Sequence, residues 1–130
     1  MLDKQAILEA SDCGLCTLEV PMWNGSVNLK RPSLKDSDYL STLLRKAFDV
    51  KNEKLVPIES EDAEKAYRKY RLYAVGFSLA DDKGERLLND EEIETILAKK
   101  SPKSIQFIFE NLESAFKKKT LTTSEGSASA

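Results

Sequence analysis

The feature that most constrains the fold is a change in the spacing of apolar residues near Ser33. From residue 15 to residue 29, apolar and polar side chains alternate, with the period of two that is typical of a half-buried strand. After Ser33, apolar residues recur at the three- and four-residue spacing of an amphipathic helix, as in Leu40, Leu43, Leu44, Ala47 and Phe48. Strands followed by helices predict an α+β fold.

The alternating segment, residues 15 to 30, predicts an antiparallel β-hairpin. Its halves meet at Asn24-Gly25, a pair that tolerates the positive φ angles of a tight hairpin turn. Pro21 has no amide hydrogen to donate to a ladder, so we expect it at an edge or at the bend.

Two helices are predicted in the middle of the chain. The first runs from about residue 35 to 48 and follows a segment rich in capping residues. Residues 49 to 59 contain Pro57 and mixed charges, so we interpret them as a connection that is either a loop or a brief edge strand. The second helix is capped by Ser60 and extends through Leu79. Its main apolar stripe comprises Ala63, Ala66, Tyr67, Tyr70, Ala74 and Phe77.

Two further helices follow a turn at residues 81 to 84. Asn89 and Glu92 form the pattern of a capping box, with Ile93, Ile96 and Leu97 as a short apolar face. Ser101 and Pro102 begin the last helix, whose apolar stripe comprises Ile105, Ile108, Phe109, Leu112 and Phe116. We therefore predict an N-terminal β-hairpin packed on about four α-helices.

The last residues change in composition. Residues 118 to 130 are rich in Thr, Ser, Gly and Ala and carry too little apolar surface to offset the entropy of ordering. We expect one α+β domain over residues 1–117 and a flexible tail over 118–130.

Composition narrows the classes of function. The 130 residues include no histidine, which removes imidazole-based nucleophile pairs, histidine metal ligands and switches that titrate near neutral pH. The 20 basic and 22 acidic residues give a net charge of −2, which argues against nucleic acid as a partner. The sequence shows no membrane-spanning apolar run and no signal peptide, so we expect a protein of the cytoplasm with no membrane partner.

Cys13 and Cys16 form an isolated CxxC motif. A redox pair of the thioredoxin type opens a helix after a strand, whereas here the motif leads into a predicted strand. Zinc requires about four ligands, which only a dimer sharing two such pairs would supply. We interpret the two residues as reduced thiols at a turn and predict neither a metal site nor a cofactor.

No catalytic arrangement is predicted. Asp90, Glu91, Glu92 and Glu94 lie where the start of a helix favours negative charge, and we expect them to be exposed. The chain contains neither a phosphate-binding GxxxxGK[ST] loop nor a GxGxxG motif. We therefore expect a protein that is not an enzyme.

Five apolar residues are candidates for binding a partner. Leu72, Val75, Leu79 and Phe107 lie off the main stripe of their own helices, so they form either a second buried face or a partner surface. Trp23, beside the hairpin turn, either anchors the hairpin on the helices or contacts a partner.

Two segments carry a resemblance to a family. Residues 19 to 27, EVPMWNGSV, resemble the "strand, Pro, x, Trp, x, Gly, x, Val" opening of tail assembly chaperones from long-tailed (siphovirus-type) bacteriophages. Residues 81 to 93, DDKGERLLNDEEI, are similar to the family's "D-x-x-G-x-x-L-F-x-D-E-D-I" turn, although Leu88 replaces its aromatic residue. Residues 100 and 101 match the "K-S" start of the next helix, and the order of elements matches over residues 15 to 116.

The resemblance implies a non-catalytic role in viral tail assembly. Proteins of this family bind the tape measure protein in the host cytoplasm and are absent from the mature virion. A longer product of ribosomal frameshifting recruits the tail tube protein, and Lys117, Lys118 and Lys119 would suit an A-rich slippery site or else stabilise a helix end. The resemblance is also compatible with self-association.

The alternative hypothesis for the function is a small cytoplasmic adaptor or regulator that binds protein or RNA.

Overall fold

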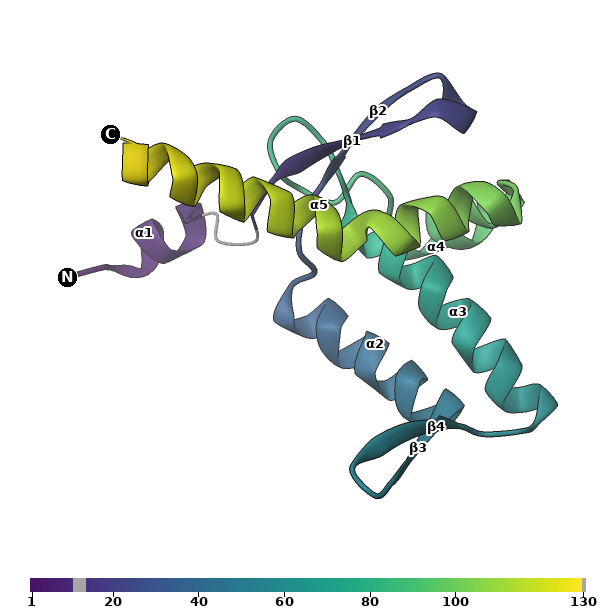
Figure 1. The fold of residues 1–130 in the computed structure, drawn as a ribbon. Coiled ribbons are helices and arrows are strands. Elements are labelled where there is room, and N and C mark those ends of the chain that lie inside the picture. The colour runs from purple at the N-terminus through teal and green to yellow at the C-terminus, as the bar shows by residue number, and fades with distance from the viewer. Residues whose placement is uncertain (11–13, 130) are drawn as a thin grey trace.

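The computed structural model describes the backbone of residues 1–10 and 14–129 and the side chains of residues 1–10 and 14–116. This part of the chain forms five α-helices, two short 3₁₀ helices and two antiparallel sheets (Figure 1). The predicted α+β class and the four helices after the hairpin are confirmed. A short helix, α1 (Lys4–Glu9), precedes the hairpin and was not predicted, because it buries no residue and so has no core-facing pattern.

The predicted hairpin comprises β1 (Cys16–Val20) and β2 (Gly25–Leu29), with Leu18 opposite Val27 and Val20 opposite Gly25. Its connection is longer than the two-residue turn that we expected. Pro21 begins a 3₁₀ turn, η1 (Pro21–Trp23), and Asn24 alone takes the positive φ, at 54°. The turn therefore depends on the fixed φ of proline and on the left-handed conformation that asparagine tolerates.

The predicted end of the long helix was wrong, because the chain forms a third strand there. Helix α3 (Glu61–Ser78) stops one residue before Leu79, which begins β5 (Leu79–Ala80). Leu79 lies opposite Leu29 and places β5 on the free edge of β2, giving the order β1-β2-β5. The backbone pairing of β2 takes precedence here over the helical spacing of the apolar side chains.

Helices α2 (Leu34–Ala47) and α3 lie side by side (Figure 1). Ser33 caps α2 by accepting a hydrogen bond from Asp36 N at 3.2 Å, and Ser60 caps α3 in the same way at 3.0 Å. Edge-on aromatic contacts join the helices: the Tyr39 ring centroid lies 5.3 Å from that of Tyr73 and 6.1 Å from that of Phe77.

A second hairpin replaces most of the predicted connection over residues 49 to 59. Strands β3 (Phe48–Lys51) and β4 (Lys54–Pro57) are joined by Asn52 and Glu53, both at positive φ. The sequence signal was weak, because Glu53 occupies a position where glycine is usual. The hairpin follows α2 at the end away from the three-stranded sheet (Figure 1).

The last helices begin with the predicted caps. The Asn89–Glu92 capping box is present at α4 (Asp90–Thr95), and Ser101 Oγ accepts from Ser104 N at 3.2 Å at the start of α5 (Pro102–Ser129). Between them, η2 (Leu97–Lys99) turns the chain so that Leu97 is buried, whereas Ile96, which we expected on the same apolar face, is 46% exposed. The backbone of α5 continues to Ser129, and the side chains after residue 116 lie outside the described part. That residues 118–130 form a flexible tail is not tested and stays a prediction.

One apolar core joins the sheet to the helices. Its fully buried members include Val20, Leu29, Val75, Ile93 and Ile108, which come from both hairpin strands, α3, α4 and α5. Helix α5 crosses α3 and also packs on β1, which closes the core between the helices and the sheet.

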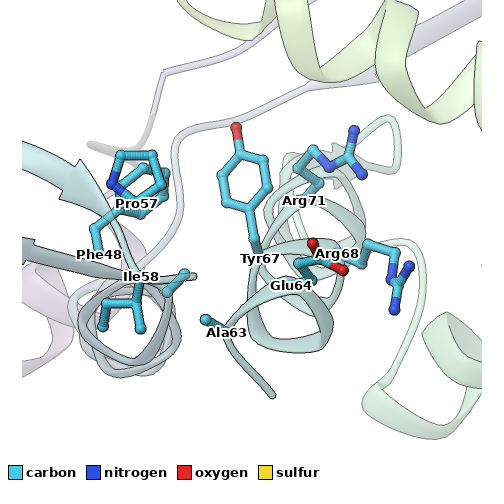
Figure 2. Close-up of a pocket in the computed structure, with 9 residues that line it drawn as sticks. Phe48, Pro57, Ile58, Ala63, Glu64, Tyr67, Arg68 and Arg71 are labelled. Carbon is cyan, nitrogen blue, oxygen red and sulfur yellow. The ribbon is translucent and has the colours of Figure 1, made fainter. Parts of the chain in front are cut away.

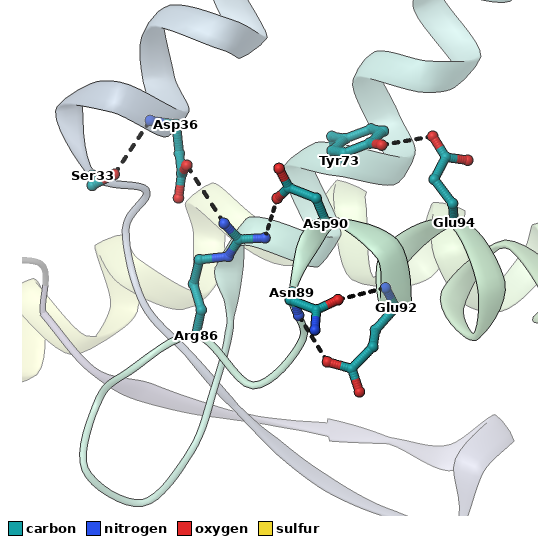
Figure 3. Close-up of polar contacts among 8 residues, drawn as sticks. All are labelled: Ser33, Asp36, Tyr73, Arg86, Asn89, Asp90, Glu92 and Glu94. Atoms are coloured by element: carbon teal, nitrogen blue, oxygen red, sulfur yellow. Dashed lines mark hydrogen bonds and ion pairs between the residues drawn. The ribbon is translucent and has the colours of Figure 1, made fainter.

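A polar cluster holds the turn between β5 and α4 against the helices (Figure 3). Arg86 lies between two carboxylates, 2.8 Å from Asp90 and 3.7 Å from the buried Asp36 on α2, and its guanidinium carbon is 4.6 Å from the centroid of the Phe77 ring. Asp81 Oδ1 accepts hydrogen bonds from Lys83 N and Glu85 N, which confirms the turn predicted for residues 81 to 84. These contacts position α4 on α3.

Candidate functional site

An aromatic row crosses one face of α3. The Phe48 and Tyr67 rings meet edge-on at 5.4 Å, Tyr67 stacks on Tyr70 at 6.0 Å, and Tyr70 meets Phe109 of α5 edge-on at 5.8 Å. All four side chains are half-buried. The row thus joins the second hairpin to α5 and leaves part of each ring open to a partner.

Two hollows adjoin this row. One, of about 360 Å³, lies between the β3–β4 hairpin and α3 and is lined by Phe48, Pro57, Ile58 and Tyr67 (Figure 2). The other, of about 580 Å³, lies between α2, α3 and α5. It is lined by Leu40, Tyr70, Ala74, Phe109, Leu112 and Phe116 among others. Because Tyr67 lines the first and Tyr70 the second, we name the two hollows and the aromatic row together the aromatic groove.

The rim of the groove is polar. Glu64, Arg68 and Arg71 lie along the hollow beside the second hairpin (Figure 2), and Arg31 and Glu110 line the other hollow. An apolar floor with a charged rim is the surface that an amphipathic helix of a partner would cover.

Burial also affects the Tyr70 hydroxyl. The pKa of Tyr70 is raised, first by desolvation and then by the neighbouring Tyr67 and Glu113. The hydroxyl therefore stays neutral to a higher pH than that of an ordinary tyrosine.

The structure separates the five predicted partner-binding residues into two groups. Val75 and Leu79 are 0% and 3% exposed and belong to the core. Trp23, Leu72 and Phe107 are half-buried and pack on the edge of that core. A role of any of them in binding a partner stays a prediction, and only the second group has surface to offer without rearrangement.

Sequence reasoning assigned the four rings of the aromatic row to the apolar stripes of helices. Tyr67 and Tyr70 do lie on the predicted stripe of α3, but the missed second hairpin supplies Phe48 as their neighbour. The tyrosines themselves carried a signal of an accessible surface. A tyrosine on an apolar stripe often buries its ring while its hydroxyl reaches solvent.

Cys16 lies half-buried in β1, opposite Leu29, and Cys13 lies outside the described residues. In the part of the chain that the structure describes, no cluster of three or more His, Cys, Asp or Glu side chains is placed to hold a metal ion. None of the described helices is long and apolar enough to cross a membrane.

The chain has the fold of a bacteriophage tail assembly chaperone. Comparison with solved structures aligns it with the tail assembly chaperone of bacteriophage HK97 at a TM-score of 0.55 and 15% sequence identity, over 77% of this chain and 83% of that one. The family resemblance is therefore confirmed at the level of the fold. Comparisons with protein-family models and with curated proteins find no match.

Proposed function

We propose that this protein is a non-catalytic tail assembly chaperone of a long-tailed bacteriophage. It binds an apolar helical segment of the tape measure protein and acts in the host cytoplasm, and it is absent from the mature virion. The observation that carries the proposal is the aromatic groove on a chaperone-like fold. Such a groove shields an apolar segment from aggregation without any chemical step.

The groove is tested by matched removal of one aromatic ring. Tyr67→Ser removes the ring shared by the Phe48 and Tyr70 contacts, whereas Tyr39→Ser removes a ring of α2 that is 38% exposed and lies outside the groove. Each variant is co-expressed with a candidate tape measure protein, and the amount that co-purifies is measured.

We expect Tyr67→Ser to reduce co-purification on the order of tenfold, and Tyr39→Ser to leave it within about twofold of the wild type. Equal losses in the two variants, with both folded by circular dichroism, would reject the groove as the binding site. Absence of any complex with the wild type would reject the chaperone function. Detection of the chain in purified virions would reject its proposed place in assembly.

A longer product recruits the tail tube protein in this proposal. Lys117 to Lys119 follow the last apolar residue of the α5 stripe, so an appended segment can leave the domain without disturbing its core. Synonymous recoding of the three lysine codons is expected to abolish the longer product while the short chain is unchanged. If no longer product exists before recoding, the frameshift does not occur in this protein.

A further inference from the structure

A second surface surrounds Arg71, beside the aromatic groove. Two further hollows lie here, of about 530 Å³ and 230 Å³, and Arg71, Pro102 and Gln106 line both. Their apolar lining includes Met22, Leu72, Leu97, Ile105 and Phe107. Met22, at the tip of the first hairpin, is 49% exposed. Leu72 lines the smaller hollow and Phe107 the larger one, so two of the predicted partner-binding residues belong to this surface.

The same surface is strongly basic in an otherwise acidic protein. Arg68, Arg71, Lys100 and Lys103 line its hollows, against one carboxylate, that of Glu110. This ratio contrasts with the 20 basic and 22 acidic residues of the whole chain. We name the surface formed by these four cations, Met22 and Phe107 the Arg71 face.

Little of this positive charge is neutralised within the protein. The ion pairs found among the described residues involve Lys65 and Arg86 and none of the four cations of the face. Arg71 Nη1 donates to the neutral amide of Gln106 at 2.6 Å, and Arg71 Nε is buried without a hydrogen-bond partner in the described structure. The positive end of the α5 dipole, at Pro102, adds to the same potential.

We propose that the Arg71 face binds an acidic amphipathic segment of a protein partner. Apolar side chains of that segment enter the two hollows, and its carboxylates pair with the four cations. Aliphatic side chains dominate the lining, which suits a polypeptide better than the stacked bases of a nucleic acid. The inference goes beyond the proposed function, because it concerns a second surface, which adjoins the aromatic groove and shares Arg68 and Arg71 with its rim. It holds whether or not the aromatic groove binds tape measure protein.

A synthetic peptide tests the proposal directly. The probe is a helical peptide of about 20 residues with leucines on one face and glutamates beside them, without tryptophan. Fluorescein anisotropy gives its affinity. The emission of Trp23, the only tryptophan of the chain, reports binding nearby, because the Trp23 ring lies 6.0 Å from Lys100 Nζ.

The key variant reverses two charges of the face, and its control reverses two charges elsewhere. Lys100→Glu with Lys103→Glu alters the face, and Lys35→Glu with Lys46→Glu makes the same change in net charge on exposed residues of α2. We expect the first pair to weaken peptide binding on the order of tenfold and the second pair by no more than about twofold. Tyr70→Ser, in the aromatic groove, should leave the affinity unchanged.

Four outcomes would overturn the proposal. Equal weakening by the two charge-reversal pairs would mean that only net charge matters. Equal binding of a peptide with lysine in place of each glutamate would remove the role of the cations. Tighter binding of a single-stranded RNA oligonucleotide would assign the face to nucleic acid. A shift of the wild-type chain from oligomer to monomer on reversal of Lys100 and Lys103 alone would assign the face to a second copy.

Discussion

Trp23 illustrates how one residue can serve both the fold and a partner. Its ring packs on the edge of the core while remaining half-buried, and Lys100 Nζ lies over it at 6.0 Å. Because only part of the ring leaves water on folding, we expect Trp23→Ala to lower the free energy of unfolding by about 2 kcal/mol, less than for a fully buried tryptophan. Urea denaturation measures the change. An unchanged midpoint together with lost peptide binding would instead make Trp23 a partner contact alone.

Tyr73 makes stability depend on pH above the neutral range. Desolvation, and then the hydrogen bond that its hydroxyl donates to Glu94 at 2.6 Å, raise the pKa of Tyr73 in the folded protein. The unfolded tyrosine ionises near pH 10, so the stabilisation is complete below about pH 10 and is lost as pH rises further toward the folded pKa.

The variant Tyr73→Phe separates this effect from other alkaline titrations. It should be about 1 kcal/mol less stable than the wild type at pH 7, because it lacks the hydrogen bond to Glu94. The difference should shrink between about pH 10 and pH 11. Urea unfolding at each pH tests this, and a difference that stays constant would show that Tyr73 does not contribute to the pH dependence.

At the scale of elements, Gly76 sets how closely α3 and α4 approach. A Cβ atom at this position would lie 2.6 Å from two side-chain carbons of Ile93, which is fully buried. Gly76→Ala should therefore destabilise the protein by roughly 1–3 kcal/mol despite the better helix propensity of alanine. Gly25→Ala is the control, because its Cβ would meet only Trp23 O at 3.9 Å. Recovery of stability on adding Ile93→Val would confirm the steric cause, whereas a neutral Gly76→Ala would contradict it.

The second hairpin has a turn that its sequence does not optimise. Asn52 and Glu53 take φ angles of 53° and 64°, a left-handed conformation that asparagine tolerates and glycine adopts freely, but that strains a residue such as glutamate. Glu53→Gly creates the preferred Asn-Gly pair and should raise the melting temperature, with a gain of up to about 1 kcal/mol. Lys51→Gly, at an adjacent strand position, should lower stability instead. If both glycines have the same effect, the turn does not limit the stability of the hairpin.

At the scale of the whole molecule, the single core predicts that the domain is independent of its last residues. Among the α5 side chains that the structure describes, those up to residue 116, Ile108 and Phe116 are the buried apolar ones. A chain ending at residue 117 should therefore fold and keep its melting temperature within about 2 °C, because residues 118–130 were predicted to add little apolar burial. A large drop, measured by circular dichroism, would show that those residues belong to the domain.

Sequence reasoning was most successful where a local rule acts alone. Side-chain caps at Ser60 and Asn89 were predicted because capping depends on residues within one helical turn. Sequence reasoning failed at Leu79. The helical spacing of apolar residues continues there, but Leu79 pairs with Leu29 at the open edge of β2 and so begins a strand. The candidate site was also largely missed, because the aromatic groove requires Phe48 and Phe109, which are distant in sequence, to meet the tyrosines of α3.

The sequence by itself determined the α+β class, the order of the first hairpin and the later helices, and the resemblance to phage tail assembly chaperones. These depend on periodicity, capping and turn residues, which act over a few positions. Tertiary structure alone decided which apolar side chains stay accessible. Leu72 and Val75 lie three residues apart on α3, yet Val75 is fully buried in the core, whereas Leu72 lines a hollow together with Lys100. The burial of a side chain depends on which elements pack against its helix as well as on the apolar stripe of that helix.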